Sequence, residues 1–190
     1  MARKTDRRTI YTTKLIKDAC YEALQKKPID QITVTQLCKA AEINRSTFYL
    51  HYMDARAVYE EMLDEVIAAI EPEGRKVFSA DDINWNFSHE IYRGIMHDER
   101  MVFLLHSGMT YEPFLKKFAN CEAEWAMEFY RTRSKLPEDD LRVVLSSLFY
   151  SYFVSDRYYL ETHTIKELER CNELMNQYII QPVHEKLISE

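Results

Sequence analysis

The chain has 190 residues, of which 46% are hydrophobic and 29% are charged, a composition that excludes a disordered protein. Its three glycines and five prolines leave little material for β-hairpins or glycine-rich phosphate-binding loops, so helices are expected throughout. The formal net charge of −6 excludes a protein that coats nucleic acid indiscriminately.

The N-terminal third begins with a predicted amphipathic helix. Apolar residues recur at helical spacing from Leu15 to Leu24, which predicts a helix over residues 9–27. Pro28 ends this helix, because proline disfavours helical geometry in the residue before it.

Polar residues are placed to begin the next three helices. Thr33 and Gln36 have the T-x-x-Q spacing of a capping box, which predicts the start of a short second helix. Asn44 is positioned to cap a third helix over residues 45–52, and Asp54 to cap a fourth.

The rest of the chain predicts further helices and no strand. The fourth helix is expected to stop near Pro72, with a hinge at residues 72–81. Later helices are expected at about 82–97, 98–107, 113–134, 137–161 and 164–182, with Pro182 ending or kinking the last. We therefore predict an all-α fold of about nine helices. Within it, residues 1–56 are expected to form a three-helix helix-turn-helix domain. Residues 57–190 are expected to form a helical ligand-binding and dimerisation body.

Residues 33–52 carry the main functional signal. Two short helices joined by a short turn can cross steeply and leave the second free to enter the major groove of DNA. Four residues near the N-terminal end of that second helix carry polar groups: Arg45, Ser46, Thr47 and Tyr49. Phe48 and Tyr52, four positions apart, are expected to pack inward.

The charge distribution agrees with a nucleic-acid contact made by this part of the chain alone. Residues 1–57 carry 11 Lys+Arg and 6 Asp+Glu, whereas residues 58–190 carry 14 and 25. A basic third on an acidic body is expected where one module meets a polyanion, although chance would produce the same pattern.

The stretch ITVTQLCKAAEINRSTFYLHYMDARAVYEEML, residues 32–63, resembles the tetracycline-repressor (TetR/AcrR) family from its second helix into its fourth. The string TFYLHY lies where that family has its most characteristic string, and the resemblance covers about residues 10–65. The resemblance implies dimeric repressors with nine helices, a variable ligand pocket in the body, and an interface built from the last two helices.

The same resemblance implies a set of DNA-contacting residues: Thr33, Thr35, Arg45, Ser46, Thr47, Tyr49, His51 and Arg56. Thr33 and Thr35 would meet phosphates or base edges from the second helix. Arg45, Ser46 and Thr47 would lie at base edges. Tyr49 and His51 would touch the DNA backbone, although a structural role for His51 is an equally open interpretation. The basic tail either adds phosphate or minor-groove contacts or is a solubilising tail; its residues are Arg3, Lys4, Arg7 and Arg8.

Two positions depart from the family pattern. Glu42 stands where the turn usually has glycine, so the chain either tolerates strain there or turns differently. Ala55 replaces the family's phosphate-binding lysine, and the neighbouring Arg56 is at best a partial substitute. Each acid or missing cation weakens the salt-dependent part of DNA binding.

The body contains a helix that is apolar nearly all round, from Leu141 to Leu160. A helix without a polar face has to be covered on both sides. A second subunit is the simplest cover, so we expect a homodimer through this helix and the segment from Ile165 to Ile179. A thicker monomeric core is the alternative.

Aromatic residues with polar groups are frequent in the body and suit an apolar cavity for an unknown small-molecule effector. The candidate ligand-binding residues are Trp85, Tyr92, Met96, His106, Trp125, Phe129 and Tyr152. For each of them, packing in the core is the competing interpretation.

Other classes of function lack a motif. The chain has no H-E-x-x-H, no zinc-ligand spacing and no G-x-S-x-G, so no enzyme, metal or cofactor is expected, and its four cysteines are expected to be buried thiols. No signal peptide or membrane-spanning run is present, so we expect a cytoplasmic protein. The predicted function is a sequence-specific transcriptional regulator, a repressor released from a palindromic operator when an effector binds. A helical protein-interaction scaffold without specific DNA binding is the alternative.

Overall fold

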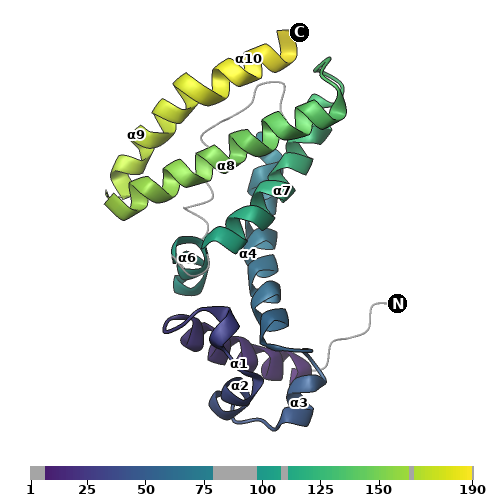
Figure 1. Ribbon diagram of the computed structural model, residues 1–190, viewed down its shortest axis with the longest axis vertical. Helices are drawn as coiled ribbons and strands as arrows, with labels where there is room; N and C mark the ends of the chain where they lie inside the picture. The colour runs from purple at the N-terminus through teal and green to yellow at the C-terminus, as the bar shows by residue number, and fades with distance from the viewer. Residues whose placement is uncertain (1–6, 79–97, 108–110, 163–164, 190) are drawn as a thin grey trace. The chain divides into compact units, whose positions relative to one another are not determined.

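The computed structural model describes residues 7–78, 98–107, 111–162 and 165–189 (Figure 1). Within these ranges every regular element is helical, with nine α-helices, a 3₁₀ turn at Ile29–Gln31 and a π-helical segment at Asn176–Ile180. The predicted all-α fold is confirmed. The helix expected at 82–97 lies outside the described residues.

Two compact units make up the described chain, and they divide inside helix α4 (Ala55–Val77), between Val66 and Ile67. The first unit holds the first half of α4 together with α1 (Arg7–Leu24), α2 (Val34–Ala40) and α3 (Arg45–Tyr49). The second holds the rest of α4 with α6 (Glu99–His106), α7 (Tyr111–Tyr130), α8 (Glu138–Thr162), α9 (Ile165–Met175) and α10 (Gln181–Ser189).

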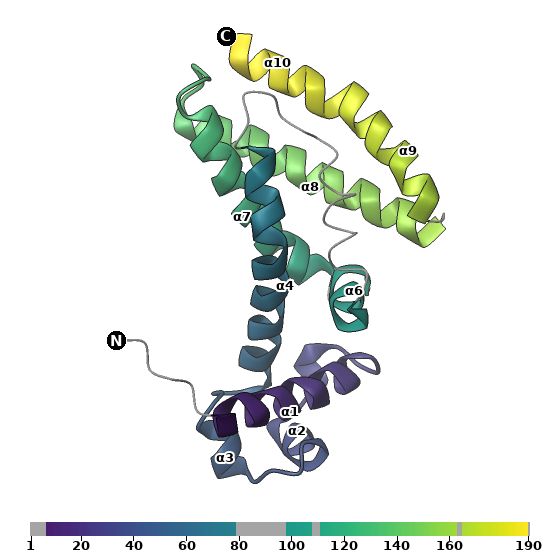
Figure 2. The ribbon, with the colours of Figure 1, turned by 180° about the vertical axis from the view of Figure 1, so that it is seen from behind.

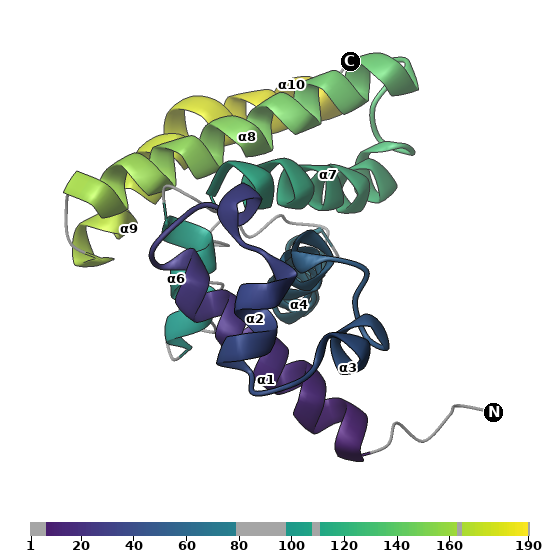
Figure 3. The same ribbon diagram turned by 60° about the horizontal axis from the view of Figure 1, so that its bottom comes forward.

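The first unit has a hydrophobic core of its own. One helix after another contributes fully buried side chains: Ile16 and Leu24 from α1, Leu37 from α2, Phe48 from α3 and Val58 from α4. Helix α2 contacts both α1 and α3, as Figure 3 shows. Burying an apolar side chain of this size contributes about 1.5–3 kcal/mol, so this core holds two very short helices in place.

An ion-pair cluster extends the first unit past the domain boundary that the sequence places after residue 56. Lys17 of α1 has its Nζ 3.0 Å from Glu61 Oε1 and also pairs with Glu65, both on α4. Burial lowers the pKa of Lys17, but hydrogen bonds to the two carboxylates outweigh burial and raise the pKa above its ordinary value. These contacts tie the first half of α4 to α1. A functional division at residue 56 stays a prediction.

The expected end of the fourth helix near Pro72 is wrong, because α4 continues through this proline. An interior proline removes one helical hydrogen bond and costs about 3 kcal/mol. Contacts beyond the proline hold the last turn: Arg75 Nη1 lies 3.3 Å from Glu128 Oε2, and the Phe78 ring packs against aromatic rings of α7 and α8. Residues 72–77 of the expected hinge are therefore helical, and residues 79–81 lie outside the described residues.

In the second unit, α7 packs against α8, and α8 packs against α9. Figures 1 and 2 show α9 and α10 running back alongside α8. Helix α7 begins two residues before the expected Pro113, which leaves this proline in the first turn, where its missing N–H is tolerated. Pro182 does not end the last helix. The π-helical segment before it shifts the backbone register, so Pro182 stands in the first turn of α10.

Candidate nucleic-acid interface

Side-chain caps define both helices of the predicted helix-turn-helix. Thr33 Oγ1 accepts a hydrogen bond from Gln36 N at 3.3 Å, and Gln36 Oε1 accepts one from Thr33 N at 3.1 Å, which confirms the capping box. Asn44 Oδ1 accepts a hydrogen bond from Thr47 N at 2.7 Å and caps α3, and Asp54 caps α4 in the same way. The caps at Thr33 and Asn44 satisfy backbone donors in helices too short to be stable alone.

Glu42 lies in the turn between α2 and α3 with a φ of 53°, in the left-handed region. Its N–H bonds to Lys39 O at 3.4 Å, and Ile43 N bonds to Cys38 O at 3.0 Å. This pair of hydrogen bonds is the Schellman pattern, in which Glu42 holds the position that favours glycine. The sequence left open whether Glu42 is strained or the chain turns differently here, and the structure shows the strained turn.

Glu42→Gly is expected to raise the free energy of unfolding by about 0.5–1 kcal/mol. Glycine removes a left-handed strain of roughly 1–2 kcal/mol, and its greater freedom in the unfolded chain returns part of that gain. Urea or thermal unfolding measures the change. The matched control is Ala41→Gly one residue earlier, where φ is −80° and glycine should only destabilise. Equal destabilisation by both substitutions would show that Glu42 is not strained.

An arginine fork connects the two helices on their exposed side. Arg45 Nη1 donates to Thr35 Oγ1 of α2 at 3.3 Å, and Arg45 Nη2 donates to Tyr49 Oη of α3 at 3.0 Å. The guanidinium carbon lies 5.7 Å from the centroid of the Tyr49 ring. We call these three residues the recognition cluster. An arginine has five N–H donors, so about three remain for an acceptor outside the protein.

The inner face of α3 holds the recognition cluster in position. Phe48 is fully buried and Tyr52 is 5% exposed, with their ring centroids 5.9 Å apart, which confirms the predicted inward packing. Burial, with Glu61 nearby, raises the pKa of Tyr52 and keeps its hydroxyl neutral. The Phe48 ring also meets the Tyr49 ring edge-on at 5.7 Å. The buried side of α3 therefore supports an aromatic ring of the exposed side.

The other predicted DNA-contacting residues do not join this cluster through any described contact. The Thr33 hydroxyl serves in the capping box, and Ser46 Oγ donates to Asn44 Oδ1 at 2.6 Å. Thr47 and His51 are half-buried. Arg56 is exposed but forms an ion pair with Asp30, so its charge is partly neutralised within the protein.

Lys27 is a basic residue of this surface that sequence reasoning missed. Its Nζ donates to Gln36 Oε1 and to Gln31 O, each at 2.7 Å, which places the ammonium group beside the capping box of α2. In the sequence Lys27 only marks the end of a helix. Its position depends on the 3₁₀ turn at Ile29–Gln31, which no periodic pattern indicates.

Comparisons with known proteins leave the family open and support the fold. No family model matches the chain, and no curated protein matches it. The chain is similar to the solved structure of the fatty acid degradation regulator FadR from Bacillus halodurans. The TM-score is 0.58 and the identity 14%, over 93% of this chain and 98% of that one. The two chains share a fold. At this identity nothing further is shown, and membership of the TetR/AcrR family stays a prediction.

The predicted effector residues are only partly described. Trp85, Tyr92 and Met96 lie outside the described residues, as do the side chains of His106 on α6 and Tyr152 on α8. Trp125 and Phe129 are buried on α7 and pack against other aromatic rings. The ring centroids of Trp125 and Phe118 are 6.0 Å apart, and those of Phe129 and Phe78 are 6.3 Å apart. Their role as ligand contacts stays a prediction.

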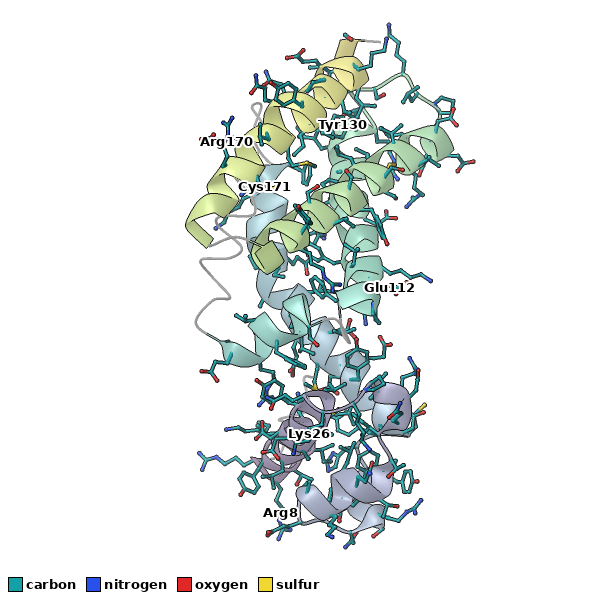
Figure 4. All side chains as sticks on the ribbon, turned by 60° about the vertical axis from the view of Figure 1, so that its left-hand side comes forward. Arg8, Lys26, Glu112, Tyr130, Arg170 and Cys171 are labelled. Carbon is teal, nitrogen blue, oxygen red and sulfur yellow. The ribbon has the colours of Figure 1, made fainter. Side chains whose placement is uncertain are left out.

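A partly buried polar pair in the second unit was not among the predicted residues. Tyr130 at the end of α7, labelled in Figure 4, has its hydroxyl 2.7 Å from His184 Nδ1 of α10. Burial raises the pKa of Tyr130, so the hydroxyl keeps its proton and can donate it to the imidazole. Because the two residues are 54 positions apart in the sequence, only the tertiary fold brings them together.

The described part of the chain offers neither a metal site nor a membrane-spanning helix. It contains no group of three His, Cys, Asp or Glu side chains that could hold a metal ion. Cys20, Cys38 and Cys171 are buried cysteines, as predicted for these three. No described helix is both long and apolar enough to cross a bilayer.

Proposed function

We propose that this protein is a transcriptional regulator of the TetR/AcrR type that binds a palindromic DNA operator as a homodimer. A small molecule bound in the body releases it. The recognition cluster carries the proposal, because an arginine fork is held between two capped helices on an exposed surface. The surrounding segment, residues 7–57, is basic, with nine Lys+Arg and five Asp+Glu.

Arg45 is the proposed base-reading residue. It is the first residue of α3, and the N-terminal residues of a recognition helix are those that reach base edges in the major groove. Arginine can donate two hydrogen bonds to O6 and N7 of guanine, a pair of acceptors that the other bases lack. Because Thr35 and Tyr49 already orient the fork, less side-chain entropy is lost on binding. Tyr49 accepts from Arg45 and can donate its own proton to a phosphate oxygen.

A homodimer through α8 is supported by a row of exposed apolar side chains. Val143, Tyr150, Val154 and Tyr158 are 65%, 48%, 45% and 62% exposed and lie seven, four and four positions apart, on one face of the helix. Residues 141, 145 and 148 on the opposite face are buried within the same chain. The segment proposed to share the interface is also partly uncovered, with Tyr178 65% and Ile179 40% exposed. An isologous dimer would cover both elements and present two recognition clusters to a palindrome.

Effector release would act through a population shift. An effector that binds one arrangement of the body better than another shifts the dimer toward it, and the spacing of the two recognition helices changes. Helix α4 is the proposed lever, because one continuous helix contributes to both units. The solved relative in fold is a fatty acid degradation regulator, and an apolar effector would suit the aromatic side chains of α7.

Selection from a random-sequence DNA library, followed by titration at several salt concentrations, tests the function. We expect a palindromic sequence to be enriched. Its affinity should fall at least tenfold between about 50 and 200 mM salt, because bound phosphates release counterions. Binding that is independent of sequence, or unchanged by salt, would favour the protein-interaction scaffold instead.

A further inference from the structure

Two large apolar side chains at the end of the recognition helix are almost fully exposed. Leu50 is 81% and Met53 is 79% exposed, more than any other large hydrophobic side chain recorded among the described residues. The fold does not need them there, because Phe48 and Tyr52 of the same segment already fill the core. Their exposure points to a contact made outside the subunit.

Leu50 extends the surface that carries the recognition cluster. It is the residue that caps the C-terminal end of α3, with helical backbone angles of −72° and −20°. Residues four apart lie on the same side of a helix, so Leu50 follows Ser46 in the row beside that of Arg45 and Tyr49. Arg45, Ser46 and Leu50 are exposed, and Tyr49 is 49% exposed. The apolar group is thus continuous with the proposed DNA-contacting surface.

The chemistry of the major groove identifies the occupant. The only apolar group on a base edge there is the C5-methyl of thymine, and apolar side chains contact it. Leu50 is five residues after Arg45, a distance of about 7.5 Å along a helix axis, which corresponds to about two base pairs. The neighbouring arginine and the basic character of residues 7–57 suit a polyanion.

We propose that Leu50 reads a thymine methyl group about two base pairs from the base contacted by Arg45, with Met53 as a second apolar contact. The inference rests on the proposed DNA-binding function and adds to it a determinant of specificity that uses no hydrogen bond. Removal of one methyl contact is expected to weaken binding about fourfold. Removal of the same contact from both half-sites of a palindrome is expected to weaken binding roughly tenfold to twentyfold.

The test uses the full chain and a duplex that the wild-type protein selects from a random-sequence library. Each thymine of the half-site is replaced in turn by deoxyuridine, in both half-sites together, because deoxyuridine lacks only the methyl group. For wild type, one such replacement should raise Kd roughly tenfold. For Leu50→Ala, the thymine and deoxyuridine duplexes should bind equally. Leu50→Met keeps an apolar side chain and is the matched control that should still discriminate.

The outcomes separate this inference from the function on which it rests. If wild type enriches a sequence but binds its thymine and deoxyuridine forms equally, the inference alone is overturned. Discrimination that Leu50→Ala retains, or that only Met53→Ala removes, overturns the assignment to Leu50. If wild type enriches no sequence, the proposed function fails and the inference fails with it. Circular dichroism of the variants checks that each is folded.

Discussion

Arg45→Ala should weaken binding to the selected DNA by about 1–3 kcal/mol per half-site, roughly fivefold to 150-fold, and should relax the base preference at one position of each half-site. The substitution removes the guanidinium group that Thr35 and Tyr49 hold in place. Fluorescence anisotropy with the selected duplex, and with duplexes changed at single base pairs, measures both effects.

Arg45→Lys is the matched control, because it keeps the charge but not the planar fork. It should retain most binding to unrelated DNA while losing preference for the selected sequence. Lys26→Ala removes an exposed charge that has no place in the recognition cluster, and it should change binding to all duplexes alike. Equal losses on selected and scrambled DNA for Arg45→Ala would contradict a base-reading role.

Val154→Arg should raise the dissociation constant of the proposed dimer at least a hundredfold. Val154 is 45% exposed within the row of apolar side chains on α8. In an isologous interface both subunits contribute the same surface, so the substitution places two new arginine charges in it. Burying unpaired charges costs several kcal/mol. Sedimentation velocity at micromolar concentration should show a dimer for wild type and a monomer for the variant.

Tyr11→Arg is the control for this substitution, because it adds the same charge at a 65% exposed aromatic residue of α1, in the other unit. It should leave the oligomeric state unchanged. Val154→Arg should also bind a palindrome much more weakly than wild type while keeping its affinity for a single half-site. A wild-type monomer, or a variant that remains a dimer, would contradict the proposed interface.

The N-terminal module was the part of the fold most accessible to sequence reasoning. The capping box at Thr33 and the cap at Asn44 act over three residues, so their partners can be identified from spacing alone. The inward packing of Phe48 and Tyr52 follows from helical periodicity. Local rules failed at Pro72, where contacts with α7 and α8 outweigh the cost of an interior proline.

The candidate site shows the same division between local and long-range information. Sequence resemblance implied Thr35, Arg45 and Tyr49 as DNA-contacting residues but did not indicate that the three bind one another. It placed Arg56 on the DNA-facing side without indicating that Asp30 pairs with it. Which carboxylate a cation meets depends on the packing of distant segments, and periodicity carries no information about that.

By itself the sequence determined the helical class and the start of the two short helices, because caps and periodicity act over a few residues. Only the tertiary structure decided that Glu42 keeps a left-handed turn and that Lys17 ties α1 to α4 across 44 and 48 positions. It also decided that Leu50 remains exposed. The physical reason is that burial and ion pairing are set by where the core places each element, and residues far apart in the chain build that core.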